Sequence, residues 1–170
     1  MVSGLPGTGK TTLSTVLAER IGAVALSRDM ARQQIGARLA LVDRVFTRMT
    51  GRHRRGLQEK AGHQLLMTAA RELAADRPVI VEAVADRAIR RRLAALAAQH
   101  EVRLYSVEVV CSDSAEHSRR LRGRPGDWER VLARMSKSYE PEPAALVVDS
   151  HDTPGTMADQ AARFISQPTS

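Results

Sequence analysis

The chain has 170 residues, which is the length of one ordinary domain with a single sizeable core. Hydrophobic residues make up 43% of it and charged residues 26%, a composition typical of globular rather than disordered proteins. Its single cysteine excludes an internal disulfide framework and a zinc site built from cysteines. No apolar run approaches the roughly 20 residues that span a bilayer, and no signal segment is recognised. We therefore expect a soluble, cytoplasmic protein with no membrane partner.

The charge is strongly positive, with a formal net charge of +7 and 23 arginines against 3 lysines. Such a balance favours an anionic partner, meaning a phosphate ester, a nucleotide or a nucleic acid. Aromatic residues make up only 3% of the chain, which argues against the base-stacking platforms of common RNA-binding and single-strand-binding modules. A nucleic-acid partner is therefore possible but not favoured.

Short apolar runs alternate with stretches of helical periodicity along the chain. The apolar runs that indicate strands are 24–26, 78–84, 102–110 and 145–148. The helical patterns are 10–21, 57–75, 88–99, 114–122, 128–138 and 156–165. Continuous runs of Val, Ile and Leu are typical of parallel strands that are buried on both faces. The alternation predicts one α/β domain of three layers, spanning 1–170 and joined by right-handed crossovers.

The chain opens on a glycine-rich loop. Residues 4–11 fit the Walker A pattern G-x-x-x-x-G-K-[ST] in full. Only three residues precede this loop, so its strand is either unusually short or begins upstream of the chain. Glycines let successive backbone N–H groups converge on phosphate oxygens, and the helix that follows directs its positive dipole end at the same anion. The residues expected to bind the nucleotide here are Gly4, Pro6, Gly7, Thr8, Gly9, Lys10, Thr11 and Thr12.

Two of these residues have a chemical role of their own. The Lys10 ammonium provides a compact charge for the β- and γ-phosphates, and the Thr11 hydroxyl is placed to ligate Mg²⁺. The loop therefore predicts ATP and Mg²⁺ as cofactors, with Lys10 taking part in catalysis.

The run that follows 24–26 places an acid at the end of the second strand. Functional groups of open α/β sheets gather beyond the carboxyl ends of the strands. Asp29 is therefore a candidate general base that accepts the proton of an attacking hydroxyl, with Arg28 and Arg32 beside it to bind the acceptor. The alternative is that Ser27 or Asp29 only caps the next helix.

A second acid, Glu82, ends the run 78–84. A carboxylate at this point either holds Mg²⁺ or orients the acceptor, and glutamate makes direct metal contact less certain than aspartate would.

Two further segments are rich in arginine. Residues 119–127 combine arginines with Gly and Pro, and we expect a mobile lid whose Arg120 and Arg124 fold over the phosphates. The alternative is a plain helix end whose arginines complement the helix dipole. The insertion 38–56 is assigned to the acceptor side, although it could equally be a solvated basic run.

These motifs, in this order, resemble the P-loop kinase family that includes polynucleotide 5′-hydroxyl kinases, chloramphenicol phosphotransferase and zeta-toxin kinases. The matching segments are GLPGTGKTTL, SRD with an arginine three residues on, VIVEA, the run RRLRGRPGDWERVLARMSKSYEP and VVDS. The resemblance implies a P-loop NTPase sheet of order 2-3-1-4-5. It also implies a general base at Asp29, an acceptor-side arginine at Arg32 and lid arginines at Arg120 and Arg124. Glu82 replaces the family's aspartate.

The function expected from these features is an ATP-dependent kinase that phosphorylates a hydroxyl of a small molecule, of the antibiotic, nucleoside or sugar class. Two alternatives stay open: a polynucleotide 5′-hydroxyl kinase, and a regulatory ATPase that has no acceptor. The presence of Asp29 and Arg32 argues against the regulatory ATPase, since a protein that only switches shape needs no base for an acceptor.

Overall fold

The structure is a computed structural model that describes residues 1–27, 30–31, 52–82, 87–123, 126–139 and 141–167. Its strands are β1 (Val2–Ser3), β2 (Val24–Ser27), β3 (Val79–Glu82), β4 (Val107–Val110) and β5 (Leu146–Asp149). All pair in parallel, in the order β2-β3-β1-β4-β5. The sheet order expected from the family resemblance is confirmed.

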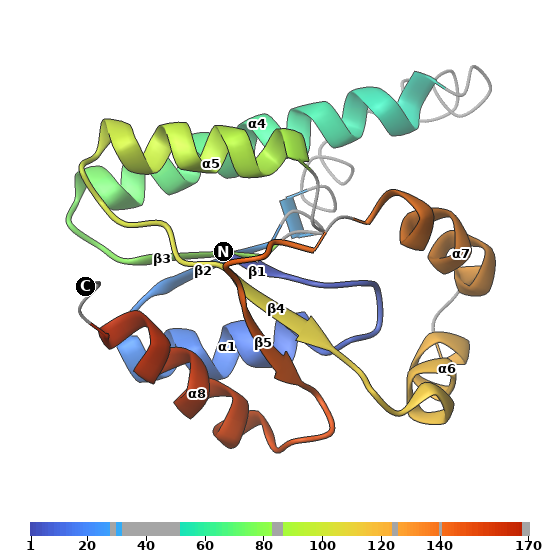
Figure 1. Ribbon diagram of the computed structural model, residues 1–170. Helices are drawn as coiled ribbons and strands as arrows, with labels where there is room; N and C mark the ends of the chain where they lie inside the picture. Colours follow the sequence, from blue (N-terminus) through green and yellow to red (C-terminus); the bar gives the residue numbers. More distant parts are fainter. Residues whose placement is uncertain (28–29, 32–51, 83–86, 124–125, 140, 168–170) are drawn as a thin grey trace.

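Helices cover both faces of this sheet (Figure 1). The helices in the described part of the chain are α1 (Lys10–Ile21), α4 (Arg52–Ala74), α5 (Arg87–Gln99), α6 (Ser114–Arg122), α7 (Trp128–Ser138) and α8 (Pro154–Ser166). One face is covered by α1 and α8 and the other by α4 and α5, so the predicted three-layer architecture is confirmed. Among the described residues, no helix combines the length and the apolar character needed to span a membrane.

Alternation along the strands divides the core into two clusters. On β3, Ile80 faces the α1/α8 layer and Val81 faces the α4/α5 layer. Fully burying a side chain such as Leu13 or Leu17 of α1 contributes about 1.5–3 kcal/mol each. The same alternation places Glu82 on the face that Ile80 occupies, toward α1.

Most element ends follow local sequence signals. Helix α1 begins after Gly9 and ends at Gly22, which has φ 65° and closes the helix with a bond from its N–H to the Ala18 carbonyl. The carboxylate of Asp113 caps α6 by accepting the N–H groups of Ala115 and Glu116, at 2.9 and 3.0 Å. For α1, α6 and α7 the predicted bounds are those observed.

The strand predicted over 102–110 is shorter in the structure and covers only Val107–Val110. Its first residues instead close the preceding helix, where the Val102 N–H donates to the Ala97 carbonyl at 2.9 Å. Pairing starts at Val107 because that residue lies opposite Val2 of β1 and Leu146 of β5, where those two strands begin. The apolar run begins several residues before the point at which partner strands are present. Composition alone therefore placed the start of this strand too early.

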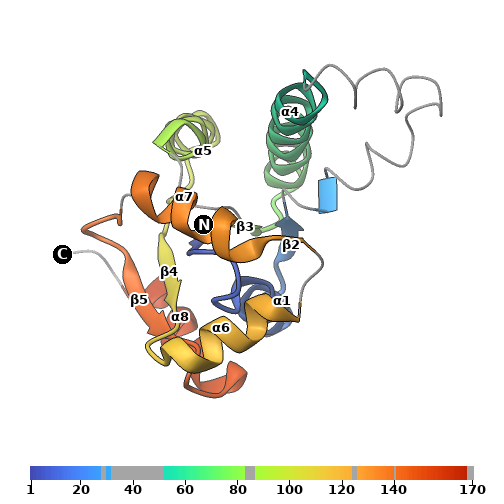
Figure 2. The ribbon, with the colours of Figure 1, turned by 90° about the vertical axis from the view of Figure 1, so that its right-hand side faces the viewer.

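The remaining two helices, α6 and α7, lie beyond the carboxyl end of the sheet rather than on one of its faces. Figure 2 views the molecule from that end and shows both helices in front of the strands. The loop between β1 and α1 reaches the same end, so this edge brings together the segments that the sequence marks for function.

Candidate active site

The glycine-rich loop joins β1 to α1, and three of its glycines adopt backbone conformations that favour glycine. Gly4, Gly7 and Gly9 have φ values of 148°, 85° and 95°. The loop places the first N–H groups of α1 at its end, where the positive end of the helix dipole favours an anion. The backbone therefore has the features expected of a phosphate site.

We predict that Gly4→Ala destabilises the fold. A Cβ at this position would lie 2.3 Å from the Val109 carbonyl oxygen and 2.8 Å from Thr8 Oγ1, and its φ is strained for any L side chain. Because the nearer atom belongs to the backbone of β4, it cannot move aside cheaply, and we expect a loss of roughly 2–5 kcal/mol in unfolding free energy. Denaturant unfolding measures it. Gly62→Ala, on a helix with open space around it, is the matched control and should leave stability unchanged or higher.

Polar side chains of the loop bond to the loop itself. The Thr8 hydroxyl and the Lys10 ammonium both donate to the Leu5 carbonyl, each at 2.9 Å. Thr8 is buried, Pro6 is buried beside it, and Thr12 is exposed on the first turn of α1. These bonds hold the Lys10 ammonium against the glycine-rich loop.

The two residues predicted to hold a metal ion are in contact. The Thr11 hydroxyl, on the first turn of α1, donates to Glu82 Oε1 at the tip of β3 at 2.8 Å. Glu82 is only 8% exposed, so its carboxylate is directed at this partner rather than at solvent. A hydroxyl and a carboxylate oxygen side by side are ligands that suit Mg²⁺, which binds few protein groups and completes its shell with phosphate and water. The residues present therefore fit the ion.

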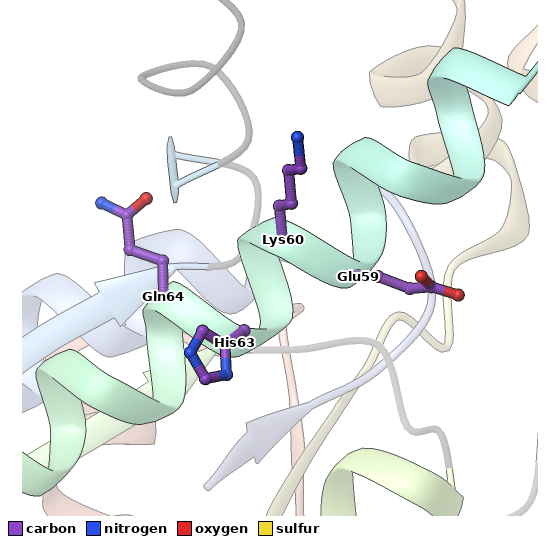
Figure 3. Close-up of a pocket in the computed structure, with 4 residues that line it drawn as sticks. All are labelled: Glu59, Lys60, His63 and Gln64. Carbon is purple, nitrogen blue, oxygen red and sulfur yellow. The ribbon is translucent and has the colours of Figure 1, made fainter.

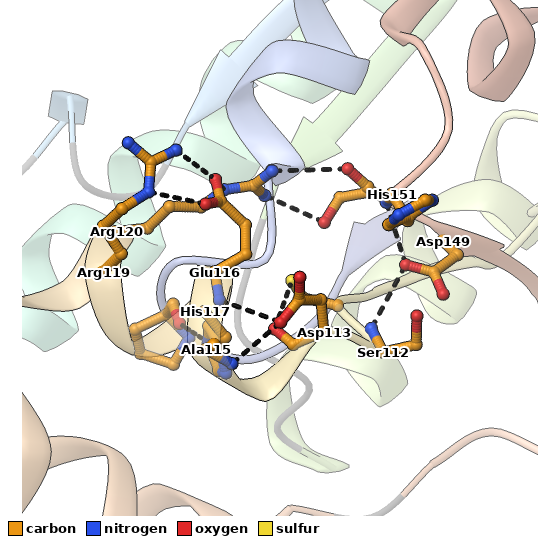
Figure 4. A network of polar contacts seen from close by, with 12 residues as sticks. Ser112, Asp113, Ala115, Glu116, His117, Arg119, Arg120, Asp149 and His151 are labelled. Atoms are coloured by element: carbon orange, nitrogen blue, oxygen red, sulfur yellow. Dashed lines mark hydrogen bonds and ion pairs between the residues drawn. The ribbon is translucent and has the colours of Figure 1, made fainter.

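Arg120 of α6 reaches the other side of the loop (Figure 4). Its guanidinium donates to Ser150 Oγ at 2.9 Å, to the Ser150 carbonyl at 3.3 Å and to Glu116 Oε1 at 2.7 Å. A Cβ on Gly9 would lie 3.8 Å from Arg120 Nη1 and 3.3 Å from Ser150 Cβ. The arginine is thus placed against the glycine that precedes Lys10.

Glu116 holds two arginines at once. Hydrogen bonds from Arg119 and Arg120 lower the pKa of the Glu116 carboxyl to about 2. Because this folded-state pKa lies below the ordinary value, Glu116 stays ionised through the neutral and mildly acidic range, and the pairing is lost only as pH falls toward about 2. Glu116 therefore stays a charged partner of Arg119 and Arg120 at neutral pH.

The segments after β4 and β5 are joined by Asp149 (Figure 4). Its Oδ1 accepts the N–H of Ser112 at 3.2 Å and that of His151 at 3.0 Å. Hydrogen bonding from Ser112 and His151 lowers the pKa of this carboxyl. The bond fixes the two loops next to each other at the carboxyl edge of the sheet, beside Ser150 and Arg120.

Several predicted residues lie outside the described part of the chain. They are Arg28, Asp29, Arg32 and Arg124, together with 38–51 of the basic insertion. Residues 52–55 of that insertion belong to the first turn of α4. The roles predicted for all of them stay predictions.

A hollow of about 490 Å³ opens along α4 and is lined by Glu59, Lys60, His63 and Gln64 (Figure 3). All four come from two turns of one helix, and three of them are exposed. It is therefore a surface groove of one element and not a site assembled by several. No motif in the sequence marks these residues.

Three residues that contact the loop or its arginine were given no role from the sequence: Glu116, His117 and Ser150. His117 Nε2 lies 2.7 Å from the Pro6 carbonyl oxygen. Of the three, only Ser150 lies in a segment that the sequence marks, because it ends the matching segment VVDS and directly follows β5 at the edge where the loop lies.

Comparison with known proteins gives a family and a set of related folds. Residues 1–142 match the model of the AAA_33 family, described as an AAA domain. No curated protein matches the sequence significantly.

Three solved structures illustrate the fold similarity. A protein taken to be a kinase, from Chloroflexus aurantiacus, superposes with a TM-score of 0.71 and 23% identity over 96% of this chain and 92% of its own. The APS kinase CysC of Mycobacterium tuberculosis, in complex with AMPPNP and APS, gives 0.67 and 15% over 98% and 95%. A gluconokinase from Sinorhizobium meliloti gives 0.60 and 22% over 96% and 91%. At these identities the likeness concerns the fold.

Proposed function

The chain belongs to the AAA_33 family of AAA domains, and from that premise we propose that it is an ATP-dependent kinase that transfers the γ-phosphoryl group to a hydroxyl of a small molecule. The observation that carries the proposal is the 2.8 Å bond between Thr11 and Glu82. It joins the helix that follows the phosphate loop to the tip of the neighbouring strand, where metal ligation is needed for phosphoryl transfer. The kinases among the structural neighbours, which act on gluconate and APS, support the small-molecule class of acceptor.

Each described residue has a part in this scheme. The N–H groups of the loop and of the first turn of α1 bind the phosphates, and the Lys10 ammonium moves from the Leu5 carbonyl to the β- and γ-phosphate oxygens. Thr11 and Glu82 would hold Mg²⁺, which offsets the charge of the phosphates when it is bound. Arg120, beside Gly9, adds positive charge at the side of the loop opposite Glu82.

The remaining predicted residues act in the transfer step itself. Asp29 accepts the proton of the acceptor hydroxyl while the oxygen forms a bond to the γ-phosphorus, and the bond from that phosphorus to the bridging oxygen of ADP breaks. Arg28 and Arg32 bind the acceptor, and Arg124 stabilises charge on the transferring group. The acceptor is of the antibiotic, nucleoside or sugar class.

An acceptor screen tests the proposal. The protein is incubated with ATP and Mg²⁺ and with single members of a panel: aminocyclitol and phenylpropanoid antibiotics, nucleosides, sugars, and oligonucleotides with free 5′-hydroxyl ends. We expect acceptor-dependent release of ADP and a product that carries one added phosphoryl group by mass spectrometry. ADP release at the same slow rate with and without every acceptor would instead identify a regulatory ATPase.

The metal assignment predicts that Glu82→Gln raises the Mg²⁺ concentration for half-maximal ADP release by about 10- to 100-fold. The amide keeps the size of the side chain and can still contact the Thr11 hydroxyl, but it removes the negative charge that attracts the ion. A magnesium titration at fixed ATP measures this. Glu101→Gln, an exposed acid in the turn after α5, is the control. An unchanged magnesium titration would remove Glu82 from the metal site.

A polynucleotide 5′-hydroxyl kinase is the second candidate. It is favoured by the net charge of +7 and by one exposed face of α7 that carries Arg130, Arg134 and Lys137 at helical spacing. The oligonucleotide arm of the screen separates the two, since a kinase of this kind phosphorylates oligonucleotide ends in preference to nucleosides.

A further inference from the structure

We propose that His117 of α6 is a positioning residue for the phosphate loop, which fixes the orientation of the peptide plane between Pro6 and Gly7. The inference rests on the proposed function, because the loop must bind a phosphate for this orientation to matter. His117 Nε2 lies 2.7 Å from the Pro6 carbonyl oxygen. Since a carbonyl oxygen can only accept, Nε2 carries the proton and donates it.

The geometry of the turn makes this one bond consequential. Residues 5–8 form a β-turn in which the Thr8 N–H approaches the Leu5 carbonyl at 3.4 Å, with Pro6 and Gly7 at its two central positions. Gly7 has φ 85°, the value of the third residue of a type II turn. A type I turn of the same four residues differs mainly in having its central peptide turned over.

Pro6 and Gly7 at the two central positions favour the observed type II form but do not enforce it. The ring of Pro6 fixes only its φ, which is shared by both turn types, and Gly7 tolerates positive and negative φ about equally. An interaction outside the turn can therefore add to this preference and hold the loop in one form. The bond from His117 to the Pro6 carbonyl provides it, because a carbonyl that is turned over would point away from the imidazole.

The selected orientation determines what the loop offers to a ligand. The peptide is trans, so the Gly7 N–H points opposite to the Pro6 carbonyl, away from α6. We infer that this N–H faces the bound phosphate, and that turning the peptide over would present a carbonyl oxygen to the anion. The packing agrees: a Cβ on Gly7 would lie 3.0 Å from Leu121 Cδ2 and 3.2 Å from His117 Cδ2, so α6 closes the outer side of the turn.

The test compares variants that keep or lose the donor. His117→Phe preserves a ring against Gly7 but cannot donate to the Pro6 carbonyl. We expect this variant to bind AMPPNP with Mg²⁺ about tenfold more weakly or worse, because the hydrogen bond from the Gly7 N–H to the charged phosphate is lost when the peptide is no longer held in place. Inorganic tripolyphosphate, which lacks the base, should lose affinity by the same factor. His117→Gln, whose amide can donate to the Pro6 carbonyl, should recover most of the affinity. Isothermal titration calorimetry measures all three.

Kinetics and controls separate positioning from mere support of the fold. In the transfer assay the KM for ATP should rise in His117→Phe while kcat at saturating ATP stays close to that of the natural protein. His100→Phe, which replaces a histidine beyond the end of α5, is the matched control. If His117→Phe does not fold, the near-isosteric pair His117→Gln and His117→Met gives the same comparison, because both lose the ring and only one donates.

The outcomes are distinct for the inference and for the proposed function. Equal affinity of the natural protein, His117→Phe and His117→Gln for both ligands would overturn the role of His117 and leave the kinase proposal standing. Equal losses in the Phe and Gln variants, with matching falls in melting temperature, would also overturn it, since they indicate packing alone. If the natural protein binds neither ligand, the phosphate site itself is wrong, and the inference falls with it.

Discussion

Replacing Lys10 by alanine is expected to lower ATP-dependent transfer by about 10³-fold, because a charge that acts on the β- and γ-phosphates in the transition state is lost. The ammonium donates to the Leu5 carbonyl and is only half-buried, so the substitution removes little from the core. The thermal unfolding midpoint should therefore change little. The rate of ADP release in the presence of an accepted substrate measures the effect.

The chain offers a matched control for this substitution. Lys60 is one of only three lysines and is exposed on α4, the helix that covers the face of the sheet opposite to α1. Lys60→Ala should keep normal rates. A Lys10→Ala protein that binds ATP with Mg²⁺ normally and turns over at the natural rate would refute the phosphate-loop interpretation as a whole.

Changing Asp29 to asparagine is expected to leave ATP affinity intact and to lower kcat by about 10²–10⁴-fold, the usual contribution of a general base. The amide preserves size and can still cap a helix, but it cannot accept a proton from the acceptor hydroxyl. Titration with AMPPNP and steady-state rates with the accepted substrate separate the two effects.

Asp76→Asn is the control for the same chemical change at a remote turn. Asp76 is exposed and has φ 54°, a conformation that asparagine also tolerates. It should have no effect on rate. Transfer by Asp29→Asn at an unchanged rate would reduce Asp29 to a helix cap, the alternative that the sequence leaves open.

The ends of several helices could be predicted from the sequence because the signals that set them are local. The bounds of α1, α6 and α7 follow from glycine and aspartate residues next to helical periodicity, and those residues act on their immediate neighbours in the chain. The sheet order came from the family resemblance carried by several motifs together, and composition alone would not have given it. Strand ends were less well predicted, as 102–110 shows, because a strand is only as long as its partners allow.

By itself the sequence determined the phosphate loop and its Lys10 and Thr11, since eight consecutive residues define both the backbone shape and the charge that a phosphate needs. The sequence also placed Glu82 at a strand tip and left open whether it holds Mg²⁺ or orients the acceptor, and only the tertiary structure decided which groups it and His117 contact. Glu82 lies 71 positions from Thr11 and His117 lies 111 from Pro6, yet the parallel sheet brings both pairs within hydrogen-bonding distance. Such contacts depend on where crossovers return the chain and on which way each side chain points, and no local pattern records either.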